Sequence, residues 1–144
     1  MKKSDFTITL LSKKTPTEIF HTILNVRAWW SGLYGEEFSG NSEKVDDVFT
    51  FKAGDGVHFS EQKLIELIPN RKIVWLVTES NLTFLENPQE WTGTKLMFEI
   101  TPKEAHMEVK FTHQGLTTQS ECYENCAPAW TQYMQTKLAP FISQ

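Results

Sequence analysis

Residues 107–141 read MEVKFTHQGLTTQSECYENCAPAWTQYMQTKLAPF, and this stretch decides the fold. The residues up to Thr112 alternate between apolar and polar side chains, which is typical of a strand with one buried face. After a turn, Thr118 and Glu121 form a capping-box pattern that predicts the start of a long helix. Because a helix laid across a curved sheet can enclose a cavity, this stretch predicts one wall and the lid of a pocket.

Pro128 lies inside the predicted helix. Proline has no backbone N–H and its ring presses on the carbonyl of the residue four positions earlier, here Glu124. We therefore expect a kink or a break at Pro128, with the longer helical piece running from there to about Leu138.

The rest of the chain reads as strands with two short helices after the first strand. Apolar alternation and β-branched runs predict strands at 6–11, 45–51, 57–68, 72–79 and 93–101, with a bulge where alternation is lost near Gln62. Thr15 as N-cap before Pro16 predicts a helix to about residue 26, followed by a short helix at 27–34 and a loop over 36–42. Short turns between consecutive strands indicate an antiparallel meander, so the predicted class is α+β, in one domain over 1–144.

Composition excludes several classes of partner. The net charge is −4 and the basic residues are scattered, so we expect no nucleic acid partner. No apolar run approaches the roughly 20 residues of a membrane span, and the N-terminus has no apolar signal region. The default expectation is a cytoplasmic protein.

Cys122 and Cys126 lie four residues apart within the predicted helix. Two helical positions at this spacing are close enough for a disulfide, but their Cβ directions do not converge well, so we expect reduced, packed thiols. A zinc site would need two further ligands, and His113 is the one candidate in sequence reach. We expect no metal and no cofactor.

Several motifs, in order along the chain, resemble those of one family. They are Thr15-Pro16-x-Glu18-Ile19-Phe20, Ala28-Trp29-Trp30, Glu66-Leu67-Ile68-Pro69, Ile73-Val74-Trp75, Phe111-x-His113-x-Gly115-Leu116 and Trp130-x-x-Tyr133 with Leu138. The chain resembles the activator of heat shock protein 90 ATPase homologue family, in its C-terminal-domain form, within the START-like (SRPBCC, pollen-allergen-like) superfamily. The resemblance implies a helix-grip fold, in which a curved antiparallel sheet wraps around a long C-terminal helix and encloses a cavity. It departs from the family pattern at Ala129, where glycine is frequent.

The alternation of side chains along the strands, together with this resemblance, gives a set of candidate cavity residues. The resemblance places Trp29, Trp30 and Tyr34 at the cavity mouth, and the inward positions of the strands and of the last helix supply Phe49, Phe51, Phe98, Met107, Val109, Phe111, His113, Trp130 and Met134. Such rings can simply fill a core, or they can line a pocket for a small apolar or aromatic ligand.

His113 is the polar member of this set. Inside an aromatic cavity it could bind a ligand or act as a general base, and the alternative is a structural histidine at the strand-to-helix turn. His58 and His106 are predicted to point outward, and Asp47 shares parity with Phe49 and could reach the cavity rim.

Three functions follow from these observations. The first is a non-catalytic small-molecule-binding or carrier domain; the second is a cyclase or hydrolase-type enzyme that uses His113, with no other catalytic residue assigned; the third is a co-chaperone-like interaction domain. We favour the first. The third is disfavoured because 144 residues leave no room for the additional N-terminal domain of the family's chaperone-activating members. The sequence is compatible with a monomer and with a homodimer.

Overall fold

The computed structural model describes residues 5–142. One antiparallel sheet of seven strands, in the order β1-β7-β6-β5-β4-β3-β2, forms most of the molecule. The strands are β1 Phe6–Ser12, β2 Glu37–Gly40, β3 Val48–Ala53, β4 His58–Ile68, β5 Lys72–Leu82, β6 Lys95–Pro102 and β7 Met107–Gln114. The helices are α1 Pro16–Leu24, α2 Val26–Trp29, α3 Tyr123–Tyr133 and α4 Ala139–Ile142.

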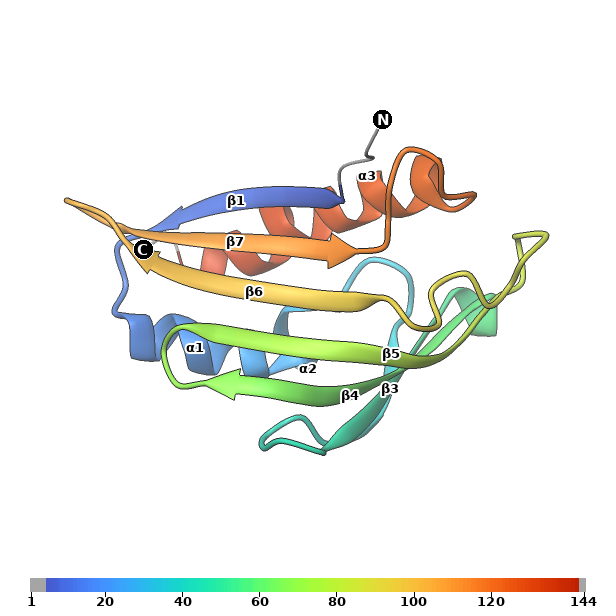
Figure 1. Cartoon of the computed structure of the whole chain (residues 1–144), viewed down its shortest axis with the longest axis horizontal. Coiled ribbons are helices and arrows are strands. Elements are labelled where there is room, and N and C mark those ends of the chain that lie inside the picture. Colours follow the sequence, from blue (N-terminus) through green and yellow to red (C-terminus); the bar gives the residue numbers. More distant parts are fainter. Residues whose placement is uncertain (1–4, 143–144) are drawn as a thin grey trace.

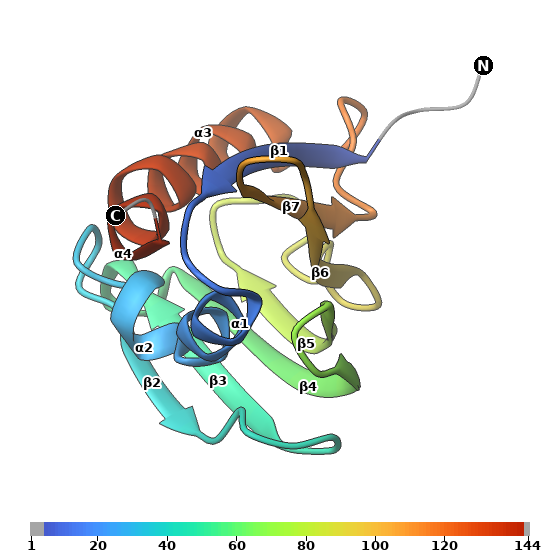
Figure 2. The same cartoon turned by 90° about the vertical axis from the view of Figure 1, so that its left-hand side faces the viewer.

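The sheet is curved, and all the helices lie on its concave side. Figure 2 shows the strands wrapping around α1 and α2, with α3 lying beside β1. In Figure 1 the same helices lie behind the sheet. This is the α+β helix-grip architecture that the sequence predicted.

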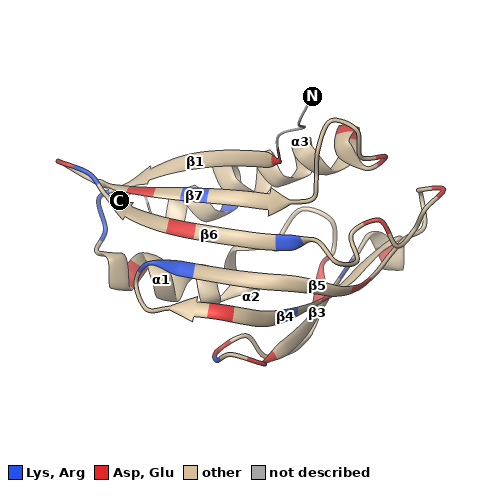
Figure 3. Cartoon of the chain, in the orientation of Figure 1, with Lys and Arg blue, Asp and Glu red and all other residues tan. Residues whose placement is uncertain are grey.

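Charged side chains of both signs are spread over the strands and loops. In Figure 3 blue and red segments are interspersed along the ribbon. No helix within residues 5–142 is long and apolar enough to cross a membrane.

Strand alternation places the core as predicted. On β7 the side chains of Val109 and Phe111 are buried and that of Lys110 is exposed. The predicted bulge near Gln62 is confirmed, because the β4–β5 register shifts between Glu61 and Gln62. The capping box of α1 is also present, with the Thr15 hydroxyl accepting a hydrogen bond from the N–H of Glu18.

Two local predictions in the first half of the chain were wrong. The segment predicted as a loop contains β2, which pairs with β3 through Phe38 and Phe51. The second short helix ends at Trp29, because the carboxylate of Glu36 binds the N–H groups of the following turn, including those of Gly32 and Leu33.

The helix predicted from Thr118 begins at Tyr123 instead. Glu121 is not part of a capping box, because its carboxylate accepts hydrogen bonds from the N–H groups of Glu86 and Asn87 in another loop. The expected break at Pro128 is absent from α3. The α-helical structure ends only after Tyr133, where a π-helical turn, Met134–Leu138, precedes α4.

Candidate functional site

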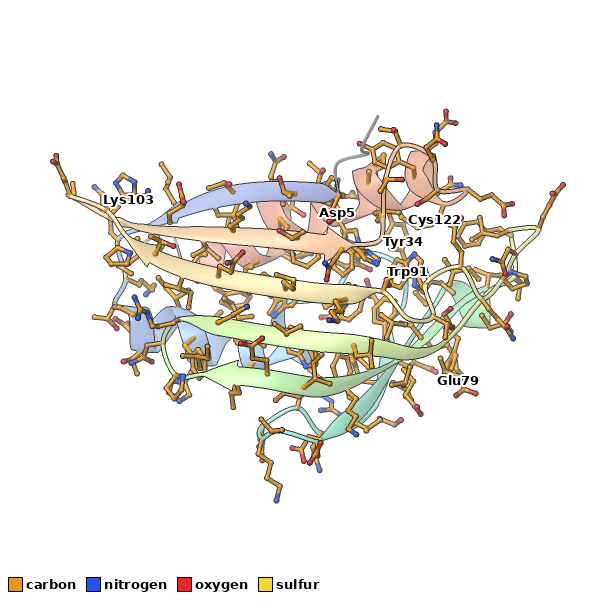
Figure 4. All side chains as sticks on the ribbon, viewed as in Figure 1. Asp5, Tyr34, Glu79, Trp91, Lys103 and Cys122 are labelled. Atoms are coloured by element: carbon orange, nitrogen blue, oxygen red, sulfur yellow. A yellow bond between two sulfur atoms is a disulfide. The ribbon has the colours of Figure 1, made fainter. Side chains whose placement is uncertain are left out.

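A cavity of about 270 Å³ opens at one end of the sheet, beside α3. Figure 4 labels Tyr34, Trp91 and Cys122, which lie together at this end of the molecule. The lining is mainly apolar and aromatic: Trp30, Tyr34, Phe51, Ala53, Gly54, Val57, His58, Phe84, Trp91, Asn125, Cys126, Ala129, Trp130 and Tyr133. Its volume is near the lower end of ligand pockets and suits a molecule of one or two rings.

Regular structure supplies two walls of the cavity. Phe51 and Ala53 point inward from alternate positions of β3. From α3 come Cys126, Trp130 and Tyr133, whose spacing of three and four residues puts them on one helix face. Residues 83–94, between β5 and β6, add Phe84 and Trp91 and are called the Trp91 segment. Trp30 and Tyr34 come from the stretch between α2 and β2.

Three indole rings and a phenyl ring form the inner surface. Trp30 stacks on Phe51 with 4.1 Å between ring centroids and lies 5.1 Å from Trp130. Trp91 is parallel to Trp130 within 11°, at 5.9 Å. These rings hold one another in place, so the wall is preformed.

His113 is fully buried behind this wall, and both of its ring nitrogens are hydrogen-bonded. The indole N–H of Trp130 donates to Nδ1 at 3.0 Å, which leaves the ring proton on Nε2. Nε2 therefore donates to Thr94 Oγ1 at 2.9 Å, and that hydroxyl donates to the carbonyl of Trp91. Burial, and secondarily the nearby His58, lower the pKa of His113 from 6.5 to about 3. His113 is thus a neutral residue that joins α3 to the Trp91 segment.

His58 was predicted to point outward, and this was wrong. Its ring lies between Phe51 and Trp91, with centroid distances of 5.3 and 4.7 Å, and it lines the cavity. Burial lowers its pKa from 6.5 to about 4, so His58 is also neutral at pH 7.

Glu36 and two tyrosines hold the cavity mouth. The hydroxyl of Tyr133 donates to Glu36 Oε2 at 2.5 Å, and the hydroxyl of Tyr34 donates to Gln132 Oε1 at 2.8 Å. Burial alone would raise the pKa of Glu36, but hydrogen bonds from Tyr133 and from backbone N–H groups outweigh it and hold that pKa below 4.5. The pKa of Tyr133 is raised by burial and by the Glu36 carboxylate.

Two carboxylates attach the Trp91 segment to the start of α3. Glu90 accepts hydrogen bonds from the N–H groups of Glu121 and Cys122 at 2.7 and 2.9 Å. Glu121 accepts in return from Glu86 and Asn87. Glu90 thereby caps a helix whose own N-cap residue makes no side-chain hydrogen bond.

The structure brings part of the predicted residue set to the cavity. Those that line it are Trp30, Tyr34, Phe51 and Trp130. The others lie away from it, in the packed interior or at its edge: Trp29, Phe49, Phe98, Met107, Val109, Phe111, His113 and Met134. Asp47 is not at the rim either, because its carboxylate accepts from the N–H groups of Glu43 and Lys44 in its own turn.

Sequence reasoning missed several lining residues. Cys126 and Tyr133 share the helical spacing of Trp130, which was a usable signal. No sequence pattern indicated that Trp91 lines the cavity. The residues around it show no regular alternation of apolar and polar side chains, and their position depends on the hydrogen bonds of Glu90 and Glu121.

The expectation of two reduced cysteines was wrong. The structure joins Cys122 and Cys126 in a disulfide with 5.5 Å between their Cα atoms. Cys122 precedes α3, so the pair is not held at two interior helical positions. Within residues 5–142 no three His, Cys, Asp or Glu side chains gather as a metal site.

A second hollow of about 490 Å³ lies between α1, α2 and residues 41–43. Its lining is more polar and includes His21, Arg27 and Glu43. Arg27 is already engaged there, because it donates to the carbonyl of Gly40. We therefore take the aromatic cavity as the candidate site.

Residues 14–142 match the family described as activator of Hsp90 ATPase homolog 1-like protein. The chain belongs to this family. The family and its START-like superfamily are those that the motifs predicted from the sequence. Comparison with curated proteins gives no match.

Solved structures show the same fold as this member of the activator of Hsp90 ATPase homolog 1-like family. The Aha1 dimer from Colwellia psychrerythraea is 21% identical, with a TM-score of 0.70 over 91% of this chain and 90% of that one. Structural-genomics proteins from Chromobacterium violaceum and Mesorhizobium loti are each 15% identical, with TM-scores of 0.72 and coverage of 96% of both chains.

Proposed function

We propose that this protein is a non-catalytic domain that binds or carries a small apolar or aromatic molecule. The observation that carries the proposal is the aromatic cavity of about 270 Å³ at the end of the sheet. Cavities lined by apolar side chains with a few polar groups are the usual form of small-molecule sites. Tyr34 and Phe84 stay 47% and 46% exposed at its mouth, which leaves apolar surface where a ligand would enter.

Binding of an apolar fluorescent dye tests this proposal. We expect the two-ring dye 6-propionyl-2-dimethylaminonaphthalene to bind with a micromolar Kd. Ala129→Phe places a phenyl ring in the cavity and should weaken binding at least about tenfold, since it removes the space the dye needs. Ala105→Phe, at an exposed turn between β6 and β7, is the matched control and should bind like the wild type. Absence of micromolar binding, or equal binding by both variants, contradicts the proposal.

The enzyme alternative depended on His113 as a base. Both nitrogens of His113 are used inside the protein and its pKa is lowered to about 3, so we assign it a structural role. The co-chaperone alternative stays a prediction that rests on the description of the family alone.

Self-association is a second part of the proposal. It is supported by the Colwellia psychrerythraea relative, whose structure is described as a dimer. Light scattering should then give about twice the chain mass of 16.7 kDa at tens of micromolar protein. A mass of one chain at every concentration contradicts this part alone.

A further inference from the structure

Five buried polar side-chain atoms have no hydrogen-bond partner among residues 5–142, and they belong to neighbouring residues. They are Nε2 of His58, Oγ of Ser60, Nε2 and Oε1 of Gln62, and Nε1 of Trp91. Native proteins leave few buried polar groups unpaired, because each costs the free energy of its lost hydration. Their concentration at one place in the fold therefore indicates a group that pairs with them.

Three of these residues form one line, which we call the polar row: His58, Ser60 and Gln62. They occupy alternate positions of β4 and share its inner face. Ser60 pairs with Phe51 across the sheet, and Gln62 pairs with Phe49. His58 lines the cavity, so the polar row starts in the cavity wall, whereas Ser60 and Gln62 lie in the buried core away from it.

Trp91 faces the start of the polar row. Its ring lies 4.7 Å from that of His58 at 85°, and both residues line the cavity. Three other indoles in this protein have partners for their N–H groups. Trp29 donates to the Ile23 carbonyl, Trp75 to Ser42 Oγ, and Trp130 to His113 Nδ1. The buried N–H of Trp91 has no such partner among the described residues.

We infer that the cavity takes an uncharged aromatic molecule bearing a hydroxyl or carbonyl oxygen, held by the Trp91 N–H and His58 Nε2. This inference rests on the proposed function and adds the ligand's chemistry.

The chemistry of the unpaired groups selects this ligand. The indole N–H only donates, so it requires an acceptor oxygen, whereas a neutral imidazole nitrogen can donate or accept. A hydroxyl satisfies both. The cavity lining contains no Lys, Arg, Asp or Glu, so an ionised substituent would lie there without a counter-charge.

A matched pair of ligands tests the inference. 2-Naphthol and 2-methylnaphthalene have the same two rings and differ by hydroxyl against methyl. Calorimetric titration should show the wild type binding 2-naphthol about 3 to 10 times more tightly, the range expected for one or two hydrogen bonds. His58→Phe keeps an aromatic ring in the cavity wall, removes Nε2 and should bring this ratio close to one. A ratio near one in the wild type, or an unchanged ratio in His58→Phe, overturns the inference.

An NMR measurement on the wild type tests the inference without depending on how well the variants fold. The indole N–H proton of Trp91, assigned through Trp91→Phe, should move downfield with 2-naphthol and not with 2-methylnaphthalene. If both ligands bind and this signal does not distinguish them, the inference is wrong. If neither ligand binds, the proposed function itself fails.

Discussion

His113 shows how one residue's surroundings decide between catalysis and structure. Its position on the inner face of β7 was predictable from the alternation that precedes it. Its partners were not, because Thr94 and Trp130 come from segments 19 and 17 residues away. Together they fix the tautomer and leave the ring no free nitrogen. A buried histidine in an aromatic protein therefore needs its hydrogen bonds known before a reaction is assigned to it.

The same burial makes stability depend on pH. The pKa values of His58 and His113 fall to about 4 and about 3 in the folded state, whereas an unfolded histidine titrates near 6.5. Below pH 6.5 the unfolded chain binds protons that the folded chain does not, so the free energy of unfolding decreases as the pH drops. We expect a loss of about 1 kcal/mol per histidine between pH 7.5 and 5.5, measured by urea denaturation.

Variants separate this effect from other titrations. His113→Gln retains a side chain that can accept from Trp130 and donate to Thr94, and it should remove about half of the pH dependence. His21, exposed on α1, gives the control, and His21→Gln should keep the wild-type slope. Equal slopes in all three proteins would show that the buried rings are not the source.

At the scale of elements, the start of α3 shows where local pattern fails. Thr118 and Glu121 have the right spacing for a capping box, but Glu121 is engaged by the N–H groups of Glu86 and Asn87. A carboxylate from a distant segment, that of Glu90, caps the helix instead. The strands were more predictable, because their alternation depends on the sheet face and not on a distant partner.

The later helix start also explains the disulfide. With Cys122 ahead of α3, the Cys122–Cys126 bond closes a short loop and tethers the first turn of the helix. We expect the Cys122→Ser, Cys126→Ser double variant to lose up to about 2 kcal/mol of unfolding free energy, the entropy of closing so small a loop. Protein purified without reductant should show no thiol reactive with dithionitrobenzoate after denaturation. Two reactive thiols per chain would mean that the cysteines are not bonded.

At the scale of the whole molecule, the space between the sheet and the helices is mostly filled. Trp29, Phe98 and Phe111 are at most 1% exposed and pack against one another or against Trp130. Strand alternation identified Phe98 and Phe111 correctly as inward-facing, but alternation cannot distinguish a ring that fills the core from one that lines a cavity. That distinction depends on the end of the sheet, where Trp91 and α3 meet, and hence on contacts between distant segments.

The mouth of the cavity joins the first third of the chain to the last. The turn before β2 is held to α3 by the Tyr133–Glu36 and Tyr34–Gln132 hydrogen bonds. Tyr133→Phe removes one of them and should cost about 1 kcal/mol at pH 7, with faster amide exchange at Gly32 and Leu33, whose N–H groups bind Glu36.

The pH dependence of the cost of Tyr133→Phe provides a control for this prediction. Because the pKa of Glu36 is held below 4.5 in the folded protein, its contribution is present above that pH and is lost as the pH falls through the folded value. The difference in unfolding free energy between wild type and Tyr133→Phe should therefore shrink below pH 4.5, while Tyr34→Phe, which loses a bond to the uncharged Gln132, should keep a constant difference. If both differences fall together, the Glu36 carboxylate does not hold the turn before β2 to α3.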